Sequence, residues 1–298
     1  MLYRIDASDS KGYPFGYGNW LVNHSLRKRM VKCLVILVFS GLVALTSWPV
    51  QADLTNIDQI ILNSDYSTVK LLAQDLYEAL APSQRDLIDR DMLVLQREAM
   101  PYVRPAEFAV DARPKPVVVV SEGFVDLVNN LSYAAANNLF EKGCLERYVC
   151  ALAQETGNKK LTEFPALSQR DLWPLRMTNE QLTRFNQMAG TLVAIEMAHH
   201  YLGHYKKYKN QLTDKDGTPV PINSVITLGE WNDALTAGAV NALGCSLSVD
   251  GIKSFFECID KMPHRPLWTA YFLLPKVNVR KVNGQLTRLE KAYFAQRR

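Results

Sequence analysis

The chain lacks the short motifs of several common enzyme classes. It has no G-x-S-x-G elbow, no phosphate-binding P-loop and no glycine-rich dinucleotide fingerprint. It also has no C-x-x-C pair, no internal repeat and no low-complexity tract. These absences argue against an α/β-hydrolase, a P-loop nucleotidase, a Rossmann dehydrogenase, a thioredoxin-like protein and a solenoid. Because 48% of its 298 residues are hydrophobic, the chain is expected to be globular with a substantial core.

Net charge is missing from most of the chain. The formal charge is +4, but six of the 34 basic residues and only two of the 30 acidic residues precede residue 53. The remainder therefore contains 28 residues of each sign. A balanced chain has no bulk attraction to a phosphate backbone, so we do not expect a nucleic-acid partner.

The chain has no apolar run as long as the roughly 20 residues that a membrane-spanning helix needs. The run CLVILVFSGLVALTSW at 33–48 follows the basic RKRMVK and precedes PVQA, which is typical of a secretory signal cleaved after Ala52. Residues 1–52 are thus interpreted as an N-terminal extension plus signal peptide. The protein is expected in the periplasm or cell envelope, with membrane contact only through an uncleaved signal. Met30 would start a leader of ordinary length, so residues 1–29 are interpreted as an over-extended reading frame.

Four of the five cysteines follow the signal segment, an even number in a compartment that allows disulfides. Proximity in sequence favours the pairs Cys144 with Cys150 and Cys245 with Cys258. Two other pairings are open, and four buried free thiols are the alternative.

Helical periodicity dominates the exported part. It predicts two helices within 56–100, and the prolines between 101 and 116 predict a connection. PVVVVSEGF at 116–124 predicts a strand followed by a helix capped by Ser121. We therefore assign residues 53–115 to a helical N-terminal region and residues 116–298 to a main domain. The predicted fold class is mainly α, an α+β fold with a small edge sheet.

A capping box, TNEQ at 178–181, predicts a long helix over about 179–208, and a further helix is expected from near Leu228. The core-facing stripe of the long helix is formed by Leu182, Phe185, Ala189 and Leu192. Glu196 and His200 continue this stripe, and His199 lies near its edge. A buried carboxylate needs a metal ion, a protonated histidine or a raised pKa to be tolerated.

Residues 195–199 read I-E-M-A-H, which matches the zinc-peptidase pattern H-E-x-x-H except at the first position. Glu196 keeps the place of the base and His199 that of the second ligand, whereas Ile195 offers no lone pair. His200 and His204 are four residues apart and could chelate an ion by themselves. E-x-x-H is also used in di-iron bundles, but the second copy that such a site needs is absent.

This region resembles the gluzincin metallopeptidases related to the heat-shock protease HtpX and the CAAX prenyl protease. The resemblance covers about residues 116–275 and depends on VVVVSEGFVDLV at 117–128, MAHHYLGH at 197–204 and EWNDALTAGAVNALGCSLSVDGIKSFFECIDKMPHRP at 230–266. It implies a zincin-like domain with zinc as cofactor and a polypeptide as substrate or client.

The resemblance also implies roles for individual residues. Glu196 would be the general base, and His199 and Glu230 would be zinc ligands. Glu230 lies three residues before Asp233, where the family usually has four, so Asp233 is an alternative ligand or a support for a histidine. His204 would be a supporting residue, and His264 would match the closing turn. The expected function is a zinc metallopeptidase; the alternative is an inactive pseudo-peptidase with a binding, scaffold or chaperone-like role.

Overall fold

The protein is mainly helical with one small sheet, as the sequence predicts. The computed structural model describes residues 55–110, 113–154 and 175–297. Its helices are α2 (Thr55–Ala79), α3 (Pro82–Arg85), α4 (Glu122–Asn137), α5 (Cys144–Leu152), α6 (Leu175–Tyr201), α7 (His204–Tyr208), α8 (Leu228–Gly244), α9 (Asp250–Asp260) and α10 (Val279–Ala295). Short 3₁₀ helices cover Lys209–Gln211, Ile222–Ser224 and Leu267–Tyr271. None of the helices within these ranges is long and apolar enough to cross a membrane.

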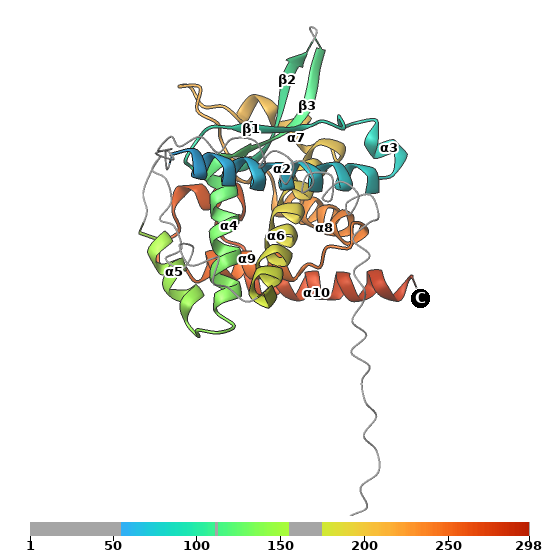
Figure 1. Ribbon diagram of the computed structural model, residues 1–298. Helices are drawn as coiled ribbons and strands as arrows, with labels where there is room; N and C mark the ends of the chain where they lie inside the picture. The colour runs from blue at the N-terminus through green and yellow to red at the C-terminus, as the bar shows by residue number, and fades with distance from the viewer. Residues whose placement is uncertain (1–54, 111–112, 155–174, 298) are drawn as a thin grey trace, which may run out of the picture. The chain divides into compact units, whose positions relative to one another are not determined.

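Helix α6 lies at the centre of the fold. It packs against α2, α4, α8 and α9, and Figure 1 shows it between α4 and α8. Every residue from 187 to 199 is buried. A helix covered on all sides has no solvent face for its polar residues, so Glu196 and His199 lie in the protein interior.

The sheet has the strand order β1-β3-β2, in which β3 (Arg113–Ser121) is central. Strand β1 (Leu93–Gln96) runs parallel to β3, and β2 (Val103–Val110) runs antiparallel to it. The β2–β3 hairpin projects from the helical body (Figure 1). Ser121 ends β3 and caps α4, since its Oγ accepts a hydrogen bond from the amide of Phe124 at 2.9 Å. The predicted strand and the helix after it are thus confirmed.

The expectation of a proline-rich connection was wrong, because Pro105, Pro114 and Pro116 lie within the two strands of the hairpin. The amide of Ser121 donates to the carbonyl of Tyr102, and in the antiparallel register this puts all three prolines at positions between the hydrogen-bonded pairs. Their nitrogens therefore face away from the partner strand, and the ladder loses no hydrogen bond. The sequence boundary expected after residue 115 falls inside β3.

The second helix expected within 56–100 is also absent. Only the single turn α3 follows α2, and residues 93–96 form β1. Leu93 pairs with Val118 and is buried by this pairing. Apolar residues over a short stretch fit either a helix or a strand, and here the neighbouring strand β3 decided between them.

The long helix differs from its predicted range of 179–208 at both ends. It begins by Leu175, and Gln181 does not cap it, because the Gln181 amide donates to Asn129 and Ser132 on α4. It ends at Tyr201, and Gly203 adopts a φ of 78°, which favours glycine. His204 consequently lies on the separate helix α7.

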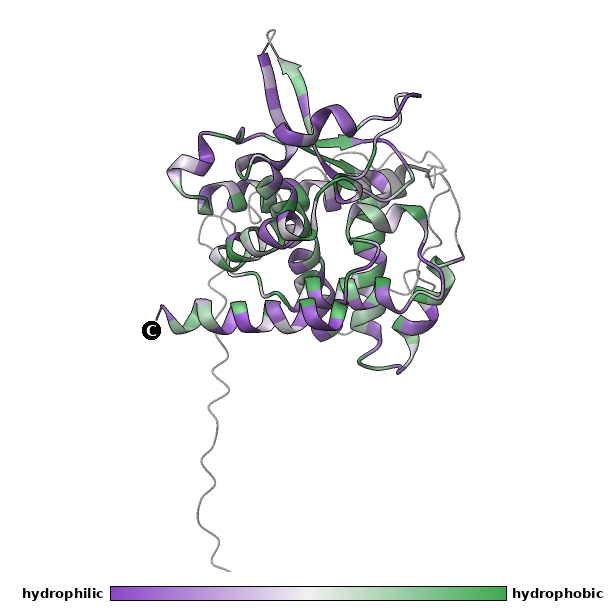
Figure 2. Ribbon diagram, turned by 180° about the vertical axis from the view of Figure 1, so that it is seen from behind, coloured by the Kyte–Doolittle hydropathy of each residue, from purple (hydrophilic) through white to green (hydrophobic). Residues whose placement is uncertain are grey.

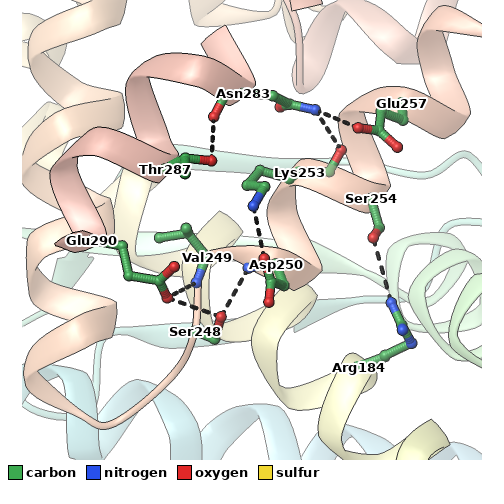
Figure 3. A network of polar contacts seen from close by, with 10 residues as sticks. All are labelled: Arg184, Ser248, Val249, Asp250, Lys253, Ser254, Glu257, Asn283, Thr287 and Glu290. Carbon is green, nitrogen blue, oxygen red and sulfur yellow. Dashed lines mark hydrogen bonds and ion pairs between the residues drawn. The ribbon is translucent and has the colours of Figure 1, made fainter. Parts of the chain in front are cut away.

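Helix α10 is fastened to the body by polar contacts (Figure 3). The Asn283 amide donates to the Glu257 carboxylate at 2.8 Å, and the Glu290 carboxylate accepts from the Ser248 hydroxyl at 2.9 Å. Polar and apolar residues alternate along this helix (Figure 2), and Val282 and Leu286 are buried on its inner face. Both kinds of contact hold α10 in place.

We expect Glu290→Ala to lower the free energy of unfolding by about 1 to 2 kcal/mol, because Ser248 and the amide of Val249 each lose their acceptor. Urea unfolding followed by circular dichroism measures this change. Lys291→Ala serves as the control, since Lys291 is exposed on the same helix. Equal stability of the two variants would contradict a role of Glu290 in fastening α10.

Candidate functional site

The position of the missing first ligand lies in a tight contact between α6 and α8. A Cβ atom added to Gly238 on α8 would lie 2.7 Å from the backbone nitrogen of Ile195 and 2.8 Å from its Cα and Cγ1. Carbon atoms do not approach so closely, so only glycine fits at residue 238. Ile195 is buried in this contact, and the space beside it is filled by protein atoms.

Glu196 points into the interior without a partner. It is 3% exposed, and its Oε2 atom has no hydrogen bond within the described residues. Burial raises the pKa of this carboxyl well above its usual range. Burial therefore favours the protonated, neutral form of Glu196.

His199 and His204 contact each other across the break after α6. Their Nδ1 atoms are 3.1 Å apart, so one ring donates and the other accepts. The other nitrogen of His199, Nε2, is buried without a hydrogen bond within the described residues. Burial lowers the pKa of His199 to about 3, and the nearby His204 and His200 add to this effect. The ring is therefore neutral at pH 7.

His200 faces the sheet and not the other two histidines. Its Nε2 lies 2.9 Å from the carbonyl oxygen of Val117 on β3. Since a carbonyl only accepts, Nε2 carries the proton and Nδ1 of the neutral ring is an acceptor. Burial lowers the pKa of His200 more than the bond to Val117 raises it. The ring of Tyr205 lies against it, with 4.9 Å between the centroids.

Glu230 is already occupied as the cap of α8. Its Oε2 accepts from the amide and hydroxyl of Thr227, both at 2.9 Å, and from the hydroxyl of Tyr208 at 3.0 Å. Its Oε1 accepts from the Lys207 ammonium at 2.7 Å. The bond to Lys207, followed by that to the Thr227 amide, lowers the pKa of Glu230 to about 2. The carboxylate is thus ionised and fully partnered.

The contacts of Glu230 could have been found in the sequence. TLGE at 227–230 is a capping box, and the structure confirms both of its hydrogen bonds. A capping glutamate faces the helix terminus and has fewer oxygen lone pairs left for a metal. Tyr208 has no such signal, because the turn that carries it is defined only by the break at Gly203.

The structure brings Asp233 near the site and leaves His264 outside it. Asp233 is exposed one turn after Glu230, and its charge, with that of Glu230, partly offsets the lowering of the His204 pKa by burial. His264 is exposed in the turn after α9. Among the described residues, the histidines of α6 and α7 contact one another, Val117 and Tyr205, and not His264.

The four cysteines in the described residues are free thiols. Cys144 and Cys150 share α5, where six residues correspond to about 9 Å of helix rise, more than a disulfide spans. That pair would form only with α5 unwound. Cys245 lies after α8 and Cys258 on α9, and burial raises the pKa of both thiols to about 12. Disulfide pairing remains a prediction.

A cleft of about 440 Å³ lies next to the C-terminal end of α6. One wall is the segment 86–89 between α3 and β1, and the other is α7 with Tyr205 and Lys206. Glu107 of β2, Pro116 of β3 and His200 complete the lining. No sequence pattern predicts this cleft, because its walls come from segments far apart along the chain.

The residues with the expected zinc-site roles do not form a set that fits zinc. Glu196 Oε2 and His199 Nε2 are unpaired and buried, but Ile195 offers no ligand atom and Glu230 caps α8. In the part of the chain that the structure describes, no three His, Cys, Asp or Glu side chains are placed to hold a metal. A structural zinc site needs four ligands and a catalytic one three. No family model, curated protein or solved structure matches this chain.

Proposed function

We propose that this chain is an exported protein that binds polypeptide on a peptidase-like helical core and does not use zinc to cleave it. The observation that carries the proposal is the contact of Ile195 with Gly238, which fills the place of the first ligand with closely packed backbone. The hydrogen bonds of Glu230 support it, since a metal at this carboxylate would have to compete with Lys207, Tyr208 and Thr227.

Binding of an extended polypeptide is supported by the edge of the sheet. Strand β2 has β3 on one side and no partner strand on the other within the described residues. The register turns the amides of Glu107 and Ala109 away from β3; the Glu107 amide donates to the Tyr205 hydroxyl, so Ala109 supplies the open amide. An open edge can add an extended chain as a further strand. Glu107 also lines the cleft at the end of α6, so edge and cleft adjoin.

The test is to measure zinc, cleavage and binding on the exported form, residues 53–298. We expect wild-type protein to contain well under one zinc per chain by mass spectrometry and to bind casein, an unstructured polypeptide, without cleaving it. Zinc near one per chain together with casein cleavage that Glu196→Gln abolishes would overturn the proposal.

Ile195→His restores the first histidine of the H-E-x-x-H pattern, and its zinc affinity is a more specific test. Glu230 keeps its partners in this variant, so we expect zinc binding no tighter than micromolar, far weaker than that of a structural zinc site. Adding Lys207→Met frees Glu230 Oε1 and should tighten zinc binding about tenfold or more, as measured by competition with a chromogenic chelator. Ile195→Asn with Lys207→Met is the control, because it changes polarity without adding an imidazole.

A second candidate, an active metallopeptidase, is favoured by one specific observation. Glu196 Oε2 and His199 Nε2 lie three residues apart on α6 and are buried without a hydrogen bond to any described residue, whereas buried polar atoms normally have partners. A cation would satisfy both. In that case wild-type protein would hold zinc before any substitution, which the zinc measurement decides.

A further inference from the structure

The charges in the cleft at the end of α6 are not all neutralised. Asp89 pairs with Lys115 at 3.0 Å, and Glu107 pairs with Lys209 at 3.6 Å. Asp86 and Lys206 also line the cleft, and neither has an ion pair among the described residues. The cleft therefore presents one free negative and one free positive group.

The remaining lining is apolar or has hydrogen-bonding capacity left. Leu87 is 52% exposed and supplies apolar surface to the cleft. Tyr205 and Pro116 supply further apolar surface. The Nε2 atom of His200 lies 2.9 Å from the carbonyl oxygen of Val117, which leaves Nδ1 as the ring nitrogen that can contact a ligand.

We propose that this cleft binds a short zwitterionic peptide with an apolar side chain. This inference rests on the proposed polypeptide-binding function and names the ligand of the same region. Asp86 takes the ammonium group, Lys206 takes the carboxylate, and the apolar side chain packs on Leu87 and Tyr205. A cleft of about 440 Å³ is large enough for a dipeptide.

The charge assignment is tested with three dipeptide probes that differ only at their ends. Leu-Leu carries both charges, N-acetyl-Leu-Leu carries only the carboxylate, and Leu-Leu amide carries only the ammonium. Isothermal titration calorimetry on residues 53–298 should show Leu-Leu binding about tenfold more tightly than either blocked probe, because each blocked probe loses one charge-assisted contact.

Two charge-removing variants assign the ends. Asp86→Asn should weaken Leu-Leu and Leu-Leu amide about tenfold and leave N-acetyl-Leu-Leu unchanged. Lys206→Gln should weaken Leu-Leu and N-acetyl-Leu-Leu and leave Leu-Leu amide unchanged. Asp216→Asn and Lys215→Gln are matched controls, since both residues are exposed and lie outside the cleft lining; neither should change any probe.

The outcomes separate this inference from the function on which it rests. Absence of saturable Leu-Leu binding, or losses that do not follow the charge removed, overturns the peptide site. If casein still binds uncleaved in that case, the proposed function stands without it. If Leu-Leu binds as expected but wild-type protein contains zinc and cleaves casein, the proposed function fails and the cleft belongs to a peptidase.

Discussion

Glu196→Gln should make the protein more stable relative to wild type as the pH rises from about 4 to 8. The folded state raises the pKa of Glu196 by burial, whereas in the unfolded chain a glutamate ionises near pH 4.3. Between these two pKa values the folded protein holds a proton that the unfolded chain has lost. Raising the pH therefore favours unfolding of wild type, by up to about 1.4 kcal/mol per pH unit.

Glutamine cannot ionise, so the variant does not lose stability in this way as the pH rises. The measured quantity is the difference in the free energy of unfolding between variant and wild type, from urea titrations at several pH values. It should be smallest near pH 4, where Glu196 is largely protonated in both states, and should grow as the pH rises toward 8. The buried side-chain amide of the glutamine variant has no hydrogen-bond partner, which changes the free energy of unfolding by an amount that does not depend on pH. The test is therefore the slope of the free-energy difference against pH.

The histidines change stability with pH in the opposite direction. The pKa of His199 falls to about 3 in the fold, so wild type loses stability as the pH drops from about 6.5 toward 3. This loss occurs in the variant as well and cancels in the difference. Glu141→Gln is the control, because it makes the same chemical change at an exposed residue.

A flat difference for Glu196→Gln would mean that Glu196 is ionised in the folded protein. A bound cation would have that effect, so the titration is repeated with a strong chelator. If the chelator restores the slope, the second candidate, an active metallopeptidase, gains the support that the proposed function loses. If it does not, the unpaired state of Glu196 in the interior is itself contradicted.

The sequence predicted the helical elements best where a local signal and the tertiary contacts agree. The cap at Ser121 is of this kind, since its side chain bonds to the helix that it begins, and the start of α8 agrees with the predicted start near Leu228. Strand β2 was missed because prolines normally break ladders, and whether they face the partner strand depends on a register that only the folded hairpin defines. Strand β1 needs β3 beside it, which the local pattern did not indicate.

The sequence predicted which site residues of the long helix are buried, but not the contacts that they make with other helices. The helical spacing placed Glu196 and His200 on the core-facing stripe and His199 near its edge. The structure buries Glu196 and His199 and half-buries His200, whereas Leu182 of the predicted stripe is 44% exposed. The spacing also suggested one continuous helix to residue 208, although the break at Gly203 gives His204 a direction that lets it contact His199. The contact of Ile195 with Gly238 joins residues 43 positions apart, so no pattern on α6 alone could indicate it.

Gly238→Ala should destabilise the protein by about 3 kcal/mol or more, the second large effect that we expect. The added Cβ would lie 2.7 Å from the Ile195 nitrogen, and relief requires α6 and α8 to separate within the core. Gly229→Ala on the first turn of α8 is the matched control, because its Cβ would meet only the Thr227 hydroxyl oxygen at 3.8 Å. Alanine there should be neutral or stabilising by up to about 1 kcal/mol.

A double variant shows whether the contact is made by backbone or by side chain. Ile195→Ala removes Cγ1 but leaves the backbone nitrogen and Cα that the new Cβ would meet, so it should rescue little of the Gly238→Ala loss. Full rescue, or a Gly238→Ala protein as stable as wild type, would show that the helices have room between them. Little rescue would mean that the backbone of α6 at residue 195 lies directly against α8. A histidine at residue 195 would then have α8 packed beside it, as Ile195 has.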